Sequence, residues 1–340
     1  MTLRALLVGA GGMGRTWAKN LCESADVTLG GWVDIRPDAA RTAADELGLV
    51  VPYCGDDLAR ALAEVQPDFL VDVTIPEAHH DVTLQALAAG VPVLGEKPMA
   101  ASMDHARAMV AASERAGKLY MVSQSRRYDA RLAAFRRLAA RACGPLGILN
   151  ADFYIGAHFG GFRDTMANVL LLDMAIHTFD AARYVLGDPL PVSVYCEEFN
   201  PPWSWYRGAA CANALFTFAD GARFTYRGSW CAEGASTSWE AAWRAVGPDG
   251  SATWDGHAAL HAERVVERGG FQSVCAPDTE SIEAAVAHSI RGSLRDFVEA
   301  LRTGSTPMGE CHDNIKSLAM VFGAIESAAT GQRVTIEIAP

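Results

Sequence analysis

The sequence has no closely spaced cysteines. Its eight cysteines lie at positions 22, 54, 143, 196, 211, 231, 275 and 311, and the closest two are Cys196 and Cys211. A C-x-x-C redox pair and the common zinc-knuckle spacings are therefore absent. We expect free thiols in a reducing cytoplasm, and no metal site.

Long apolar runs are also missing. No stretch approaches the ~18 apolar residues that a membrane-spanning helix needs. The N-terminus has no basic segment followed by an apolar core and a cleavage site, because it passes directly into an apolar run. We therefore expect a cytoplasmic protein that does not bind a membrane.

Positive charge is scarce. The chain has 29 lysines and arginines against 40 aspartates and glutamates, a formal net charge of -11. No cluster of basic and aromatic residues offsets this charge locally, so nucleic acid is not an expected partner. Half of the residues are hydrophobic, which favours a globular chain, and a length of 340 residues favours about two domains.

The pattern of predicted secondary structure changes near residue 125. Residues 1–124 alternate apolar runs with helical patterns, which predicts βα units around a doubly wound parallel sheet. Residues 125–340 begin with a long helical pattern over 129–142 and continue with alternating strand patterns, one of them over 238–246. A continuous helix is expected over 170–186. The predicted fold class is α/β, with a second α+β domain built on a largely antiparallel open sheet.

A glycine-rich turn follows the first strand-like run, Leu3 to Val8. The turn reads Gly9-Ala10-Gly11-Gly12-Met13-Gly14 and opens a helical pattern. In such turns the first glycine permits the tight bend, the second lets the backbone approach a pyrophosphate, and the third allows close packing of helix and strand. This context predicts a dinucleotide-binding site.

Asp34 ends the second strand-like run, twenty positions beyond Gly14. A carboxylate there accepts hydrogen bonds from the ribose hydroxyls and repels a 2′-phosphate, which favours NAD over NADP. Ile35 and Arg36 follow it. Arg36 leaves NADP open, because an arginine can reach a 2′-phosphate, and it can equally be a solvated surface charge.

Glu96-Lys97-Pro98 follows a predicted parallel strand at its carboxyl end, which is the edge where open α/β sheets bind ligands. Pro98 disfavours the helical region for Lys97, so the backbone there is extended. The tripeptide fits either a surface turn or a reactive lysine with a carboxylate beside it.

Asp173 and His177 lie four positions apart in an otherwise apolar helical pattern. On a continuous helix both side chains would share one face. They fit either a satisfied core pair or an acid-base site, since an imidazole exchanges protons near neutral pH.

The order of these motifs resembles that of the glucose-fructose oxidoreductase, inositol dehydrogenase and MocA family. The motifs are the glycine turn with Asp34, then Thr74-Ile75-Pro76 with His79, then Glu96-Lys97-Pro98, and then Asp173-x-x-x-His177. The closing segment over 313–338 agrees with that family, so the resemblance covers essentially the whole chain.

The resemblance implies an N-terminal Rossmann domain, a C-terminal domain whose open sheet forms homodimers or homotetramers, and hydride transfer at a carbinol carbon of a sugar or cyclitol. It implies that His177 takes the hydroxyl proton, Lys97 stabilises the same oxygen, and Asp173 orients the substrate. Thr74, Ile75, Pro76 and His79 would lie along the nicotinamide half of the cofactor, and Glu96 and Lys97 are further candidates for cofactor contact.

Two features depart from the family pattern or fall outside it. Many members carry glycines before and inside the helix with Asp173, whereas this chain has Asn168 and Ala175. Asn168 can contact substrate or cap the helix. The aromatic segment 203–206 fits a lid or sugar platform and an oligomer contact equally well. The remaining candidates for substrate contact are Tyr154, His158 and Arg163.

The sequence thus predicts an oxidoreductase that uses NAD, or NADP, on a small polyhydroxylated substrate. Two other functions use the same motifs. One is an NAD-dependent enzyme that cleaves glycosides through transient oxidation, and the other is a non-catalytic nucleotide-binding sensor. Net turnover of the cofactor separates them.

Overall fold

A computed structural model describes residues 2–283 and 288–338 of the chain. The described residues form two compact units, one from residues 2–125 and 288–315, the other from residues 126–283 and 316–338. The chain therefore returns to the first unit late in the sequence. No helix in the described ranges is both long and apolar enough to cross a membrane.

The first unit contains a parallel sheet of six strands in the order β3-β2-β1-β4-β5-β6. This strand order is that of a dinucleotide-binding Rossmann fold, which confirms the predicted parallel sheet. The strands are β1 (Leu3–Val8), β2 (Val27–Val33), β3 (Tyr53–Gly55), β4 (Phe69–Asp72), β5 (Val93–Gly95) and β6 (Tyr120–Val122). The helices are α1 (Gly12–Glu23), α2 (Ala39–Leu47), α3 (Leu58–Val65), α4 (Pro76–Ala88), α5 (Met103–Ala116) and α8 (Ser289–Thr303).

Local signals in the sequence set the ends of these helices. The Asp57 side chain caps α3 by accepting from the Arg60 amide, and Ser102 caps α5 by accepting from the His105 amide. Such caps satisfy amides that the first helical turn leaves without partners. Helix α8 joins this unit through Phe297, whose ring packs edge-on against Phe69 with the centroids 5.4 Å apart.

The second unit is built on a sheet of nine strands in the order β14-β13-β12-β11-β7-β10-β9-β8-β15. Among the strand pairs described, only β7 and β10 run parallel, so the predicted antiparallel character is confirmed. The strands are β7 (Ile148–Tyr154), β8 (Pro191–Phe199), β9 (Cys211–Phe218), β10 (Arg223–Ser229), β11 (Ala242–Gly247), β12 (Gly250–Trp254), β13 (Leu260–Glu267), β14 (Val274–Asp278) and β15 (Val334–Thr335).

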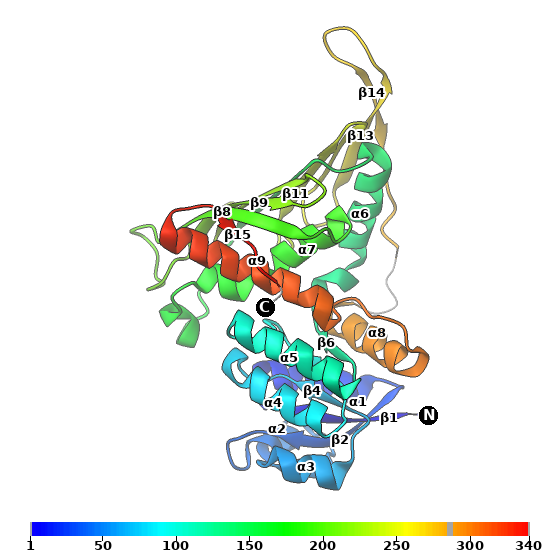
Figure 1. Cartoon of the computed structure of the whole chain (residues 1–340), viewed down its shortest axis with the longest axis vertical. Coiled ribbons are helices and arrows are strands. Elements are labelled where there is room, and N and C mark those ends of the chain that lie inside the picture. The colour runs from blue at the N-terminus through cyan, green and yellow to red at the C-terminus, as the bar shows by residue number, and fades with distance from the viewer. Residues whose placement is uncertain (1, 284–287, 339–340) are drawn as a thin grey trace. The chain divides into compact units, whose positions relative to one another are not determined.

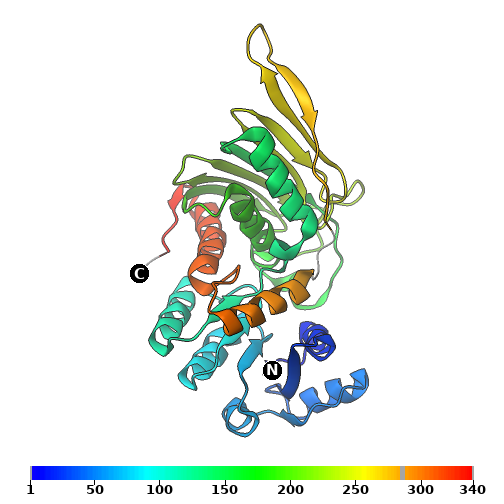
Figure 2. The same cartoon turned by 90° about the vertical axis from the view of Figure 1, so that its right-hand side faces the viewer.

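Helices cover one face of this sheet. Figures 1 and 2 show α6 (Ala130–Cys143) and α7 (Ile176–Leu186) lying against it, and α9 (Cys311–Thr330) runs beside β8. Phe179 of α7 packs on the rings of Phe216 and Tyr226, with centroids 4.8 and 5.2 Å away. Buried and accessible residues alternate along β9 and β10, which is typical of a sheet with one covered face.

The prediction of one continuous helix over 170–186 is wrong for its first part. Leu170–Ala175 form a π-helix, here η3, and α7 starts only at Ile176. Backbone hydrogen bonds tie the entry of this segment to a distant loop, because Ala209 donates to Ala167 and accepts from Leu170. Hydrophobic periodicity carries no information about such a contact. Asp173 therefore lies in a wider turn than an α-helix would give.

The strand expected over 238–246 is also shorter than predicted, since β11 starts at Ala242. Ser238 accepts from the Glu240 amide through its hydroxyl, and Ala241 has a φ of 65°. These features form a turn, which leaves Trp239 exposed while Trp243 is buried in β11.

A buried ion pair joins the start of the second unit to α7. Arg127, in the short helix η1 (Ser125–Tyr128), donates from Nε and Nη2 to the two carboxylate oxygens of Asp180, at 2.7 and 2.8 Å. The two side chains are 3% and 1% exposed. Both charges are thus fully desolvated, and each depends on the other.

We expect Arg127→Leu to lower the melting temperature by roughly 10 °C, because an unpaired buried carboxylate costs about 3–5 kcal/mol. Arg227→Leu is the matched control, since Arg227 makes the same bidentate pair with Asp152 but is 59% exposed. Such a surface pair contributes only ~0.2–1 kcal/mol. Calorimetry of both variants tests this, and equal losses would contradict it.

Candidate functional site

The glycine turn lies between β1 and α1. Gly9 has a φ of 103°, which a residue with a side chain rarely adopts, and a Cβ on Gly14 would lie 2.1 Å from the Gly9 carbonyl oxygen. Gly11 and Gly12 are different, because no atom lies within 4 Å of a Cβ at either position. The turn therefore needs Gly9 and Gly14 to fold, whereas the fold does not explain Gly11 and Gly12.

Asp34 is buried at the end of β2, where the Ala10 amide donates to its Oδ2 at 2.7 Å. Arg36 donates to both carboxylate oxygens, at 2.9 and 3.0 Å. Burial by itself would raise the pKa of Asp34, but the hydrogen bonds from Arg36 and the Ala10 amide lower it below its ordinary value. Asp34 is therefore a carboxylate beside the glycine turn, and Ile35 next to it is exposed.

A buried aspartate ends β4, and a buried histidine of α4 lies beside it. The Thr74 hydroxyl donates to Asp72 Oδ1 at 2.6 Å, and His79 Nδ1 lies 2.9 Å from Asp72 Oδ2. Burial opposes a charge on His79, but Asp72 outweighs it and raises the pKa of His79. The sequence predicted His79 and Thr74 as site residues but missed Asp72, although a polar residue at the end of a buried strand was a visible signal. Ile75 stays exposed before α4, which begins at Pro76.

Lys97 follows β5 and is held through its backbone. Glu96 Oε2 accepts from the Lys97 amide at 3.1 Å, and Glu96 Oε1 accepts from the Trp17 indole at 2.7 Å. Glu96 is buried, and burial raises its pKa. The Lys97–Pro98 peptide is cis. Trp17 on α1 thus supports a motif eighty residues downstream, which no spacing rule in the sequence indicated.

Asp173 and His177 are accessible positions in a buried stretch. Both are partly exposed, whereas the other residues from Met174 to Val185 are buried. Arg163 Nε lies 2.5 Å from Asp173 Oδ2, and its guanidinium also stacks over Phe159 and Phe162 at 4.9 and 4.8 Å from the ring centroids. This accessibility favours a functional pair over a core pair.

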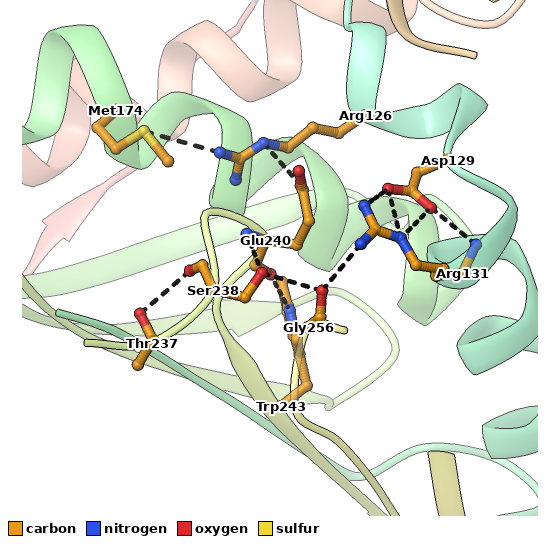
Figure 3. A network of polar contacts seen from close by, with 9 residues as sticks. All are labelled: Arg126, Asp129, Arg131, Met174, Thr237, Ser238, Glu240, Trp243 and Gly256. Atoms are coloured by element: carbon orange, nitrogen blue, oxygen red, sulfur yellow. Dashed lines mark hydrogen bonds and ion pairs between the residues drawn. The ribbon is translucent and has the colours of Figure 1, made fainter. Parts of the chain in front are cut away.

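Arg126 lies beside this stretch, as Figure 3 shows, and was missed by the sequence analysis. Its Nε lies 3.1 Å from Glu240 Oε2, and its Nη2 lies 3.7 Å from the sulfur of Met174. The buried Nη1 has no hydrogen-bond partner among the described residues. Burial lowers the pKa of Arg126. A strong donor thus lies next to the turn that carries Asp173.

The Asn168 side chain forms a hydrogen bond with an acidic residue of β8. Its Nδ2 donates to Glu198 Oε2 at 2.6 Å, and burial raises the pKa of Glu198 to about 7. The sequence did not indicate this contact between Glu198 and Asn168, because thirty residues separate the two. The pair places a titratable group beside the segment that enters the π-helix.

His158 and Tyr154 are placed differently from Asp173. His158 stacks on Trp205 with centroids 3.7 Å apart, and its Nε2 lies 2.7 Å from Glu233 Oε1. Tyr154 lies at the end of β7, and its side chain is on the same face of the strand as that of Asp152. Asp152 pairs with Arg227 on the face of the sheet away from α7. The structure therefore does not bring Tyr154 together with Asp173 and His177.

The loop over 203–206 packs on its own chain. The Trp205 indole and the Tyr206 hydroxyl both donate to the Ala157 carbonyl oxygen. This ties the loop to the segment that leads to Arg163, while Trp203 is 71% exposed.

Comparison with known proteins matches both units. Residues 3–124 match the model of an oxidoreductase family with an NAD-binding Rossmann fold, and residues 166–336 match the C-terminal α/β domain of that family. The chain belongs to the glucose-fructose oxidoreductase, inositol dehydrogenase and MocA family. It is an NAD(P)-dependent oxidoreductase with an NAD-binding Rossmann fold, as its sequence resemblance predicted.

Several known proteins are similar to the chain over most of their length. D-apiose dehydrogenase from Paraburkholderia graminis is 27% identical, over 89% of this chain and 82% of that protein. Inositol 2-dehydrogenase from Streptomyces avermitilis is 26% identical, over 99% and 95%. An oxidoreductase from Agrobacterium radiobacter, solved with NAD+, L-tartaric acid and magnesium, has the same fold, with a TM-score of 0.84 at 22% identity over 99% of each chain.

For this family member, we expect Gly11→Ala to weaken NAD binding at least tenfold while the melting temperature changes by only a few degrees. The protein itself has room for the added methyl group, because no atom lies within 4 Å of a Cβ at Gly11. The methyl group would instead block the close approach of the NAD pyrophosphate to the backbone. Gly14→Ala should instead destabilise the fold through its clash with Gly9. Calorimetric NAD titration and thermal melts separate the two effects, and unchanged NAD binding by Gly11→Ala would refute the site.

We expect Glu198→Gln to stabilise the protein more at pH 8 than at pH 5. The pKa of Glu198, about 7, lies above its ordinary 4.5, so the folded state binds this proton more tightly and loses stability as the pH rises between the two values. Glutamine keeps an acceptor for Asn168 without a charge. Denaturant unfolding at both pH values measures this, with exposed Glu197→Gln as control. If the variant and the wild type differed in free energy of unfolding by the same amount at both pH values, the raised pKa of Glu198 would be contradicted.

Proposed function

We propose that this enzyme oxidises a CH–OH group of a sugar, sugar derivative or cyclitol and transfers the hydride to NAD. The partly exposed side chains of Asp173 in the π-helix and His177 in α7, within a mostly buried segment, carry this proposal. The names of its relatives support the substrate class, since they include D-apiose dehydrogenase and inositol 2-dehydrogenase.

In the oxidative direction, His177 accepts the hydroxyl proton as the carbon loses its hydride to the nicotinamide and becomes a carbonyl. Lys97 donates a hydrogen bond to the same oxygen and stabilises its developing negative charge. Asp173 orients the substrate, and Arg163 fixes the Asp173 carboxylate through the 2.5 Å contact. Proton, hydride and carbonyl then balance without another reactant.

Arg126 and Asn168 supply further polar contacts to substrate hydroxyls in this proposal. The buried Nη1 of Arg126 supports its part, since an unpaired buried donor is costly and a substrate oxygen would satisfy it. Asn168 has a second amide atom available beyond the one bound to Glu198. His158 and Tyr154, with their different surroundings, contribute least.

NAD rather than NADP is proposed as the preferred cofactor, because Asp34 keeps a negative charge next to the glycine turn and already holds Arg36. A homodimer or homotetramer is proposed through the sheet face away from α7, where Tyr195 and Phe199 of β8 are exposed. A cytoplasmic location is supported by the eight cysteines, all of which are free thiols.

The proposed roles predict that Lys97→Ala and His177→Ala lower kcat by at least a hundredfold on whichever sugar, inositol or glycoside supports NAD reduction. Oxidation by the wild type should slow as the pH falls, because a protonated imidazole cannot accept the hydroxyl proton. Absorbance of reduced nicotinamide measures both. Exposed Lys118→Ala and His261→Ala serve as controls that keep the wild-type rate.

Full turnover by either active-site variant would remove that residue from the catalytic set. A flat pH profile would count against His177 as the base. Product formed from a glycoside without net reduction of NAD would favour transient oxidation followed by cleavage.

A further inference from the structure

The segment before α9 brings three metal-ligating side chains together in the first unit. Glu310 pairs with Met121 of the edge strand β6, and the Val122 amide donates to the Gly309 carbonyl oxygen at 2.8 Å. Helix α9 starts at the next residue, Cys311. The cluster is thus held on the Rossmann sheet by backbone contacts, away from the glycine turn of β1.

The donor atoms of Glu310, Cys311 and His312 all lie within 4.8 Å of one another. Glu310 Oε1 is 3.0 Å from Cys311 Sγ and 2.7 Å from His312 Nδ1, and Sγ is 3.5 Å from Nδ1. In the described parts of the chain, this is the cluster that gathers three such donors.

These distances are close to one face of a zinc tetrahedron. Bonds of about 2.3 Å to sulfur and about 2.0–2.2 Å to nitrogen and oxygen separate a thiolate from its neighbouring ligands by ~3.5 Å and an imidazole nitrogen from a carboxylate oxygen by ~3.3 Å. The Sγ to Nδ1 distance matches, and the two contacts of Oε1 need to lengthen by roughly half an ångström. A small rotation of the Glu310 carboxylate provides this.

Glu310 divides its two oxygens between separate tasks. Its Oε2 accepts from the His312 amide at 3.0 Å and so caps the first turn of α9. Its Oε1 faces the thiol and the imidazole. The capping bond accounts for the position of Oε2. Oε1 lies close to both the thiol and the imidazole, and a cation bound there would be coordinated by all three groups.

Glu114 on α5 supplies the partner that a metal-binding histidine usually has. Its Oε1 lies 2.9 Å from His312 Nε2, which leaves Nδ1 directed at Glu310 and Cys311. A carboxylate on the far nitrogen fixes the ring and its tautomer in most metal sites. The His312 side chain is 51% exposed and Cys311 is buried, so an ion has a route from solvent.

We propose that Glu310, Cys311 and His312 bind one divalent transition-metal ion, best matched by zinc, with Glu114 orienting His312. One thiolate, one imidazole and one carboxylate form a mixed set that suits zinc and leaves a fourth position for water. No metal site was expected from the sequence, because that expectation rested only on the spacing between cysteines, whereas these ligands are adjacent residues of three types. The bound ion would link the start of α9 to α5 and stabilise the fold.

Cobalt provides the test, because a cobalt-thiolate bond produces a charge-transfer absorption band. Full-length protein is treated with a chelator, dialysed and titrated with Co2+. We expect one Co2+ per chain with this band, and loss of the band when Zn2+ is added. His312→Gln and Cys311→Ser should abolish it, and Glu114→Gln should weaken Co2+ binding by about 10–100-fold.

Cys22→Ser and His261→Gln are matched controls, since both side chains are exposed and lie outside the cluster. Each should bind Co2+ as the wild type does. The half-exposed His312 keeps the test valid if Cys311→Ser misfolds, which circular dichroism would show. No thiolate band in the wild type, or an equal band in folded His312→Gln, would overturn the proposal. The readout is independent of the proposed dehydrogenase activity.

Discussion

The ion pair of Arg127 and Asp180 fixes the helix that carries His177. Asp180 lies one helical turn after His177 in α7, and its Oδ1 also accepts from the Ser317 hydroxyl of α9 at 2.7 Å. Arg183 in turn donates to Ser317 at 2.9 Å. Segments far apart in the sequence thus meet at one buried carboxylate. Because both charges are desolvated, the pair tolerates little displacement, and the position of the imidazole depends on it.

Local physics made much of the first unit predictable. The glycine turn needs a positive φ at Gly9 and no side chain at Gly14, and both requirements are written in adjacent residues. Asp34 and Lys97 were found because they come one and two residues after strands whose apolar patterns are visible in the sequence. Strand β3 was not predicted, since Pro52 interrupts the apolar run that leads into its three residues.

The features that could not be predicted from the sequence depend on contacts between residues far apart in the chain. The π-helix around Asp173 depends on backbone bonds to Ala209, and the half-buried Glu198 contacts Asn168, thirty positions away in the sequence. Trp17 supports Glu96 in the same way. In each case the residue types were ordinary for their local pattern, and only the fold gives them partners. The candidate site was therefore predicted as a set of motifs, without the side chains that hold it.

In the proposed reaction, a carbinol carbon gives its hydride to NAD. The most direct test uses a substrate found by NAD reduction and carrying deuterium at the carbon to be oxidised, followed by mass spectrometry of the nicotinamide product. We expect one deuterium in each NADH formed, and one NADH for each carbonyl product. Unlabelled NADH, or product without NADH, would contradict it.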